Sequence, residues 1–156
     1  MAKMQAPSSV RALFGTDDTK NAVHGSDSGP SWKRETDLFF SSRLKPSAFF
    51  SSCTCCIIKP HAVANGDAGK IIDIILSEGF EISAMEMFTL DKPTAEEFYE
   101  VYRGVLPEFV ALIDHMTTGP CIVLEVRQEN AVKAFRDLAG PMDTEIAKNL
   151  RPGSIR

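Results

Sequence analysis

The sequence predicts an α/β fold of the α+β sandwich kind, in which helices cover a small sheet that is mainly antiparallel. From residue 53 onward, short apolar runs rich in β-branched residues alternate with segments whose apolar side chains recur at helical spacing. The chain has 156 residues, of which 44% are hydrophobic, so it can bury one core of ordinary size. We therefore expect one domain.

Three apolar runs predict the strands. The run CTCCIIKP ends in Lys59 and Pro60, and a proline stops strand pairing. Residues 80–90 place apolar side chains on one face with a period of two. The run CIVLEV at residues 121–126 is the third candidate.

The segments between these runs predict helices. Residues 67–78 carry isoleucines at helical spacing, and Gly79 stands where a helix would end. Thr94 and Glu97 form a T-x-x-E capping box, which predicts a helix over residues 95–103. Further helices are predicted from Pro107 to residue 116, over residues 130–138 and over residues 143–150.

The N-terminal third has weaker patterns. Residues 20–24 are consistent with a strand, and residues 30–40 with a helix that has proline in its first turn. Residues 41–52 are rich in serine and predict a linker, while residues 1–9 predict a disordered start.

Composition excludes several classes of function. A net charge of −4 and a pI near 5.4 argue against nucleic-acid binding, which needs an excess of lysine and arginine, but leave small anionic ligands open. No apolar run approaches the roughly 18–20 residues that span a membrane, and the polar start is not a signal peptide, so we expect a soluble, intracellular protein. The four cysteines lack paired C-x-x-C zinc spacing and predict reduced, buried thiols.

The segment KNAVHGSDS at residues 20–28 places His24 directly before a Gly-Ser-Asp-Ser turn, and Glu35 follows the histidine by eleven residues. This pattern resembles the active-site signature of nucleoside diphosphate kinases. Other parts of the chain resemble the same family: CCIIKPHAVANGDAGKII, EEFYEVY, TGP, AVKAFR and RPGSIR. The resemblance extends from Val10 to Arg156 and implies the ferredoxin-like α+β core of that family.

The order of these parts is permuted relative to the family, in which the histidine segment comes near the end. Arg11 and Arg156 fall on the same family position, so the chain resembles about one period of a tandem two-copy member. Residues 10–40 then correspond to the C-terminal part of a first kinase-like copy. Residues 53–156 correspond to a kinase-like domain that lacks its own histidine segment. One working site would need the two parts to form a circularly permuted domain.

The resemblance implies ping-pong transfer of the γ-phosphate of a nucleoside triphosphate to a nucleoside diphosphate through a phosphohistidine. His24 is the implied nucleophile, and an unperturbed imidazole, with a pKa of about 6.5, is mostly neutral at physiological pH. Glu35 would fix the orientation and tautomer of the imidazole. A lone histidine in a turn is otherwise more often a helix-capping residue.

The resemblance assigns nucleotide binding to six residues: Lys59, Tyr99, Arg136, Arg156, Asn21 and Arg11. Lysine and arginine suit phosphate oxygens, the asparagine would bond the sugar, and the tyrosine would lie near the phosphates. The implied cofactor is Mg²⁺, carried by the nucleotide phosphates. Taken singly, Lys59 and each of these arginines would more often be a solvated surface charge than a phosphate ligand.

Three positions depart from the family pattern. Glu108 stands near the position of the family's base-stacking aromatic, with Phe109 beside it. Met142 replaces a phosphate-binding threonine, and His61-Ala62 replaces Asp-Gly.

From the resemblance as a whole we predict a cytoplasmic nucleoside diphosphate kinase that binds nucleoside di- and triphosphates. The alternative is a catalytically weak scaffold of the same fold at the centrosome, cytoskeleton or cilium axoneme, with tubulin or centrosomal and axonemal proteins as partners. A truncated product that folds poorly is a third reading, which the sequence does not rank.

Overall fold

The computed structural model describes residues 6–41, 44–150 and 152–155. The chain divides into two compact units, Met1–Lys45 and Pro46–Arg156, called here the first and second units. The boundary falls inside the segment 41–52, which the sequence predicts as a linker between residues 10–40 and residues 53–156. None of the helices in the described residues is long and apolar enough to cross a membrane.

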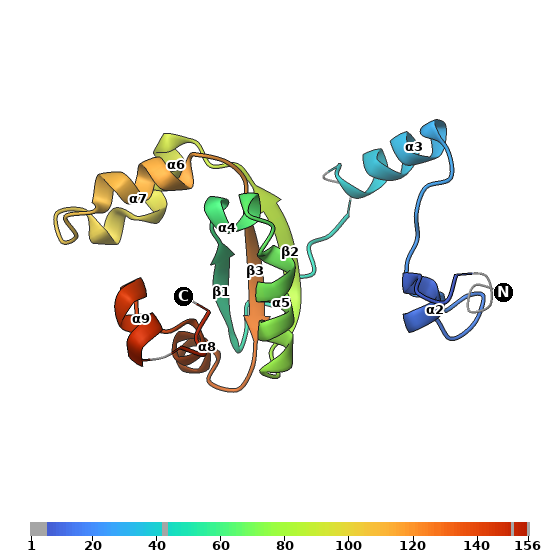
Figure 1. Ribbon diagram of the computed structural model, residues 1–156. Helices are drawn as coiled ribbons and strands as arrows, with labels where there is room; N and C mark the ends of the chain where they lie inside the picture. The colour runs from blue at the N-terminus through green and yellow to red at the C-terminus, as the bar shows by residue number, and fades with distance from the viewer. Residues whose placement is uncertain (1–5, 42–43, 151, 156) are drawn as a thin grey trace. The chain divides into compact units, whose positions relative to one another are not determined.

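A three-stranded antiparallel sheet forms the centre of the second unit (Figure 1). Its strands are β1 (Cys53–Ile58), β2 (Glu81–Phe88) and β3 (Cys121–Arg127), in the order β1-β3-β2. Leu124 of β3 pairs with Cys56 on one side and with Met85 on the other. Since β3 is antiparallel to both neighbours, β1 and β2 run parallel, and the connection between them is a split β-α-β unit.

The helices of the second unit follow the predicted order with two differences. They are α4 (Pro60–Ala64), α5 (Ala68–Ser77), α6 (Lys92–Phe98), the 3₁₀ turn η1 (Glu100–Tyr102), α7 (Phe109–Met116), α8 (Ala131–Ala139) and α9 (Thr144–Leu150). The sequence pattern did not predict α4, in which Pro60 starts a helix as well as ending the strand. It also placed the start of α6 too late, because Asp91, not Thr94, is the cap and accepts the Thr94 amide at 3.0 Å.

Two clusters of buried side chains hold the sheet and helices together. On one face, α5 and α8 cover Leu124 and Val126, and Ile75 of α5 is fully buried there. Burying a side chain such as isoleucine stabilises the fold by about 1.5–3 kcal/mol. On the other face, Ile113 and Met116 of α7 form a second cluster with the end of α6.

The rest of that second face is crossed by the segment Pro46–Ser52, called here the strap. Glu125 of β3 accepts the backbone amides of Phe49 and Phe50 at 2.7 and 2.9 Å, and the Ser83 hydroxyl at 2.6 Å. The Ser83 hydroxyl and the Phe49 amide lower the pKa of the Glu125 carboxyl to about 2. Arg127 adds a cation–π contact, with its guanidinium 4.4 Å from the centre of the Phe49 ring. Part of the segment predicted as a linker is thus bound to the sheet.

The cysteines differ in part from the prediction of buried thiols. All four are free, and Cys56 and Cys121 are buried, but Cys55 is exposed and Cys53 is half-buried. The alternation of a strand explains the difference, because Cys53 and Cys55 share the face that α6 and α7 leave partly open. Burial raises the pKa of the Cys56 thiol to about 12.

The first unit contains α2 (Val10–Phe14) and α3 (Gly29–Phe39), and the prediction of a strand over residues 20–24 is wrong. Ala22 has a φ of 72°, which is incompatible with an extended strand. The Asp17 carboxylate accepts the Thr19 and Lys20 amides at 2.9 and 2.7 Å, so local bonds replace sheet pairing. Residues 1–5 of the predicted disordered start lie outside the described residues.

Candidate active site

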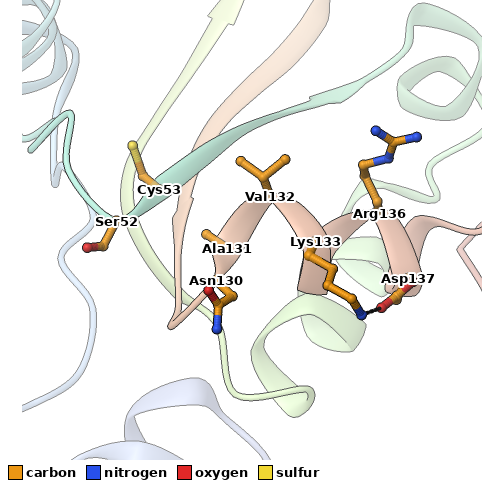
Figure 2. Close-up of a pocket in the computed structure, with 8 residues that line it drawn as sticks. All are labelled: Ser52, Cys53, Asn130, Ala131, Val132, Lys133, Arg136 and Asp137. Atoms are coloured by element: carbon orange, nitrogen blue, oxygen red, sulfur yellow. Dashed lines mark hydrogen bonds and ion pairs between the residues drawn. The ribbon is translucent and has the colours of Figure 1, made fainter.

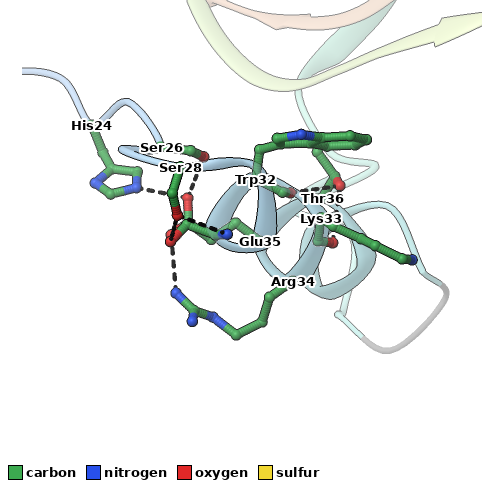
Figure 3. A network of polar contacts seen from close by, with 9 residues as sticks. His24, Ser26, Ser28, Trp32, Lys33, Arg34, Glu35 and Thr36 are labelled. Carbon is green, nitrogen blue, oxygen red and sulfur yellow. Dashed lines mark hydrogen bonds and ion pairs between the residues drawn. The ribbon is translucent and has the colours of Figure 1, made fainter.

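The first unit brings three residues of the histidine signature together (Figure 3). His24 Nε2 lies 2.9 Å from Glu35 Oε2, and the Ser26 hydroxyl donates to the same oxygen at 2.5 Å. Arg34 Nη2 lies 3.3 Å from the other carboxylate oxygen, Oε1. One carboxylate therefore joins the imidazole, a hydroxyl and a guanidinium.

Local sequence places the carboxylate. The Ser28 hydroxyl caps α3 by accepting the Ser31 amide at 3.3 Å, and Pro30 stands in the first turn, where its missing N–H costs nothing. Because the helix starts at Gly29, Glu35 lies in its second turn, where its side chain contacts His24 before the helix. The cap and the spacing of eleven residues together create the contact.

Hydrogen bonding fixes the charge and tautomer of the pair. The Ser26 hydroxyl and then His24 lower the pKa of the Glu35 carboxyl, so it is ionised at neutral pH. An ionised carboxylate only accepts hydrogen bonds, so the neutral imidazole carries its hydrogen on Nε2. The lone pair is then on Nδ1. The His24 side chain is 74% exposed, against 23% for Glu35, so the imidazole is accessible while its partner is covered.

Two other predicted site residues of the first unit support the backbone before His24. Arg11 of α2 donates from Nε to the carbonyl oxygen of Val23 at 3.1 Å. The side-chain amide of Asn21 donates from Nδ2 to the backbone carbonyl oxygen of Asp18 at 3.0 Å, within the same loop. In this structure Arg11 thus positions the residue next to the histidine, and Asn21 closes a turn.

In the second unit, Lys59 is half-buried at the point where β1 ends and α4 begins. His61 lies two residues later on α4, and its Nδ1 is 3.1 Å from Nε2 of His115 on α7. Burial, then His61 and Lys59, lower the pKa of His115. A lysine and two imidazoles therefore gather at this end of β1.

Tyr99 belongs to the second buried cluster. It is 7% exposed, and its ring contacts Phe98 and Tyr102 with centroids 4.8 and 6.2 Å apart. Burial raises the pKa of its hydroxyl. The ring packs as a core residue, and the expectation that Tyr99 lies near the phosphates stays a prediction.

Arg136 lines an open hollow of about 600 Å³ between α8 and the start of β1 (Figure 2). Lys133 shares this hollow and is paired with Asp137 at 2.8 Å, while Cys53 and Asn130 line it from the β1 side and the start of α8. Arg136 is exposed.

The departures from the family pattern can also be placed. Glu108 is exposed before the first residue of α7. Phe109 packs against the second cluster, and the Arg103 guanidinium lies 5.0 Å from its ring centroid, so this ring is not a free stacking surface. Met142 is 60% exposed. Arg156, the last predicted nucleotide-binding residue, lies outside the described residues.

Sequence reasoning missed Arg34 and Glu125. Nothing in the pattern around Arg34 distinguishes it from a solvated helix residue. Glu125 did carry a signal, because a charged residue interrupts the apolar run CIVLEV, and a charge in the middle of a central strand needs partners.

Comparison with known proteins agrees with this architecture. The family model described as "Nucleoside diphosphate kinase" matches residues 1–44 and 52–156. The chain is 49% identical over its whole length to "Nucleoside diphosphate kinase homolog 7" of Rattus norvegicus, and 47% identical to the protein of that name in Mus musculus. It spans 40% of the length of each of these relatives.

Other relatives and solved structures match about two thirds of the chain. The nucleoside diphosphate kinase of Aquifex aeolicus is 41% identical over 103 residues, which are 66% of this chain and 72% of the relative. A crystal form of the A. aeolicus enzyme superposes with a TM-score of 0.64 at 40% identity, covering 67% of this chain and 74% of that one. The predicted α+β fold is confirmed, and the chain belongs to the nucleoside diphosphate kinase family.

Proposed function

We propose that this chain is a nucleoside diphosphate kinase that transfers phosphate through Nδ1 of His24. The observation that carries the proposal is the bond from His24 Nε2 to Glu35, which leaves the Nδ1 lone pair on an imidazole that is 74% exposed. A nucleophile held by an orienting group is the arrangement that covalent catalysis requires. Membership of the kinase family supports the same chemistry.

The proposed reaction has two balanced halves. In the first, the Nδ1 lone pair attacks the γ-phosphorus, the bond from phosphorus to the bridging oxygen breaks, and the nucleoside diphosphate leaves with those electrons. In the second, a β-phosphate oxygen of another diphosphate attacks the phosphorus, and the P–N bond breaks to restore the imidazole. Glu35 offsets the positive charge of the phosphorylated ring in between, since its lowered pKa keeps it ionised.

The second unit would supply the charge that phosphoryl transfer needs. Lys59 and Arg136 are the proposed partners of the phosphate oxygens, because cations aimed at the transferring group stabilise its developing charge. The Mg²⁺ ion would arrive as part of the nucleotide. Within the described residues, no group of three or more histidine, cysteine or acidic side chains is placed to hold a metal.

Transfer also requires the two units to meet around one nucleotide, with reacting atoms about 3–3.5 Å apart. We propose that both units come from the same chain. Covalent linkage raises the effective concentration of one unit around the other to roughly the millimolar range. This exceeds ordinary protein concentrations and favours pairing within one chain over pairing between copies.

A catalytically weak scaffold of the same fold is the second candidate. It is favoured by Glu108 at the base-stacking position and by Phe109, which is packed under Arg103. Trp32 and Phe39 on α3, exposed by 56% and 63%, offer apolar surface for a protein partner. Tubulin and centrosomal or axonemal proteins are the partners proposed for this role.

Labelling with γ-phosphate separates the two candidates. The full chain would be incubated with magnesium ATP and kept mildly alkaline, because phosphohistidine is acid-labile, before mass analysis of the peptides. We expect label on His24, none in His24→Ala, and less in Lys59→Ala and Arg136→Ala. Lys33→Ala is the matched control, since it removes an exposed lysine that pairs with Asp37 on α3. If the wild type carries no label, or if His24→Ala is labelled equally, the kinase proposal is wrong and the scaffold role is favoured.

A further inference from the structure

The second unit contains a pair of histidines that the proposed kinase mechanism does not use. His61 Nδ1 and His115 Nε2 are 3.1 Å apart, and their rings lie with centroids 5.0 Å apart and planes tilted by 48°. The residues are 54 positions apart in the chain, so the fold creates the contact. Two ring nitrogens at this distance share one hydrogen, donated by one ring and accepted by the other.

Both histidines stand on elements that are held in place. His61 follows Pro60, which is buried as the first residue of α4. His115 lies between Ile113 and Met116 on α7, which are 2% and 0% exposed. A β-carbon added at Gly119, just past α7, would lie 4.0 Å from the Pro60 side chain, so the end of α7 is close to the start of α4. The two rings are therefore presented by a packed scaffold and not by free loops.

We propose that His61 and His115 form a binding site for a late first-row divalent metal ion such as Zn²⁺, Ni²⁺ or Cu²⁺, which lies between the two facing ring nitrogens in place of the shared hydrogen. The ring that donated this hydrogen then carries it on its other nitrogen, so both imidazoles stay neutral. Neutral imidazole is a preferred ligand of these ions, whereas Mg²⁺ and Ca²⁺ prefer oxygen ligands. The site therefore differs in chemistry from the magnesium that accompanies a nucleotide.

The distance between the nitrogens fits a chelate. With Zn–N bonds of about 2.0–2.1 Å, two ligands of a tetrahedral ion have nitrogens about 3.3–3.4 Å apart. The pair at 3.1 Å would need to open by only a few tenths of an ångström, with a rotation of the rings. In the described residues no third histidine, cysteine or acidic side chain completes a ligand set, so the remaining positions would go to water. His61 is exposed, which gives the ion a route from solvent.

Two neighbouring features set the selectivity and strength of the site. The positive charge of Lys59 near His115 opposes a cation, so the affinity should be lower than that of a structural zinc site. The cysteine thiols are the rival ligands, but burial raises the pKa of Cys55 and Cys56, which keeps them protonated at neutral pH. The histidine pair is thus the favoured site for a first metal ion.

Calorimetric titration of the full chain with Zn²⁺, without nucleotide and at neutral pH, tests this proposal separately from the kinase. The chain has three histidines, so His24→Gln is the matched control that keeps the pair. We expect one saturable site in wild type and in His24→Gln. His61→Gln and His115→Gln should each weaken Zn²⁺ binding by about tenfold or more. A tenfold loss of affinity corresponds to about 1.4 kcal/mol of binding free energy. The double variant should bind Zn²⁺ no more weakly than either single variant, because the two histidines bind the ion together and losing one removes the chelate.

Electron paramagnetic resonance with Cu²⁺ identifies the ligands directly. Wild type should show coupling of Cu²⁺ to two imidazole nitrogens, and this two-nitrogen coupling should be lost in His61→Gln. Because His61 is exposed, His61→Gln should fold normally, so the test does not depend on the folding of His115→Gln. The proposal is overturned if wild type shows no saturable Zn²⁺ binding, or if the double variant binds Zn²⁺ as tightly as wild type. It is also overturned if Cys55→Ser loses the site with both histidines intact. None of these outcomes depends on phosphorylation of His24.

Discussion

At the scale of single residues, what the sequence predicts best is local. His24, Ser26 and Glu35 lie within twelve positions, and one helix cap is enough to bring them together. The contact between His61 and His115 was beyond prediction, because it depends on how α4 and α7 pack. Arg11 shows the same limit: the resemblance assigns it to nucleotide, whereas the structure shows it bonded to the Val23 carbonyl.

The residue with the sharpest expected effect is Glu35. Glu35→Gln keeps the size of the side chain but removes the charge that fixes Nε2–H and offsets the phosphorylated ring. We expect the rate of phosphorylation of His24 in a single turnover to fall by at least roughly tenfold, or 1.4 kcal/mol in activation free energy. Arg34→Ala, which removes a neighbour bonded to the other carboxylate oxygen, should have the smaller effect. Equal rates in Glu35→Gln and wild type would show that the carboxylate does not orient the nucleophile.

At the scale of elements, periodicity located the strands and most helices, and it failed where local side-chain bonds decided the backbone. Residues 20–24 carry an apolar pair but form no strand, because Asp17 closes a turn and Ala22 is left-handed. The start of α6 was misplaced because two candidate caps, Asp91 and Thr94, stand within one turn. The strap could not be read from its serine-rich composition, since Glu125 binds it from 75 positions away.

The strap gives a pH dependence whose sign follows from Glu125. Its pKa is about 2 in the folded chain and 4.5 in the reference state, so the folded state favours the ionised carboxylate. The resulting stability is fully present above about pH 4.5 and is lost as pH falls toward about 2. We expect the difference in melting temperature between wild type and Glu125→Gln to shrink across this range.

Hydrogen exchange locates the effect of the same substitution. The amides of Phe49 and Phe50 should exchange faster in Glu125→Gln at neutral pH, because they lose a charged acceptor. Glu86→Gln, which changes an exposed carboxylate on β2, is the control and should leave both amides protected. Unchanged exchange at residues 49 and 50 in Glu125→Gln would mean that the strap is held by other contacts.

At the scale of the whole molecule, the residues of the proposed kinase site are divided between two units. The second unit has a buried core around Ile75 and Leu124, whereas α3 in the first unit contains no buried residue. The family resemblance predicted both parts and their permuted order. The boundary between the two units falls inside the predicted linker over residues 41–52.

Mixing two defective variants tests whether one chain supplies the whole site. His24→Ala lacks the nucleophile and Arg136→Ala lacks a proposed phosphate ligand, so each should be impaired alone. If the tethered units of one chain act together, the mixture should show only the average of the two activities at micromolar protein. Activity well above that average would instead mean that units from different copies form the site.

In the proposed mechanism, Glu35 holds Nε2 of His24 and leaves Nδ1 to accept phosphate. Phosphorus NMR of the chain after reaction with magnesium ATP, kept alkaline, distinguishes the two ring isomers of phosphohistidine. We expect a single Nδ1-phosphohistidine resonance, which is absent in His24→Ala and is lost when a nucleoside diphosphate is added and takes up the phosphate. An Nε2-phosphohistidine, or no phosphohistidine in the wild-type chain, would contradict this mechanism.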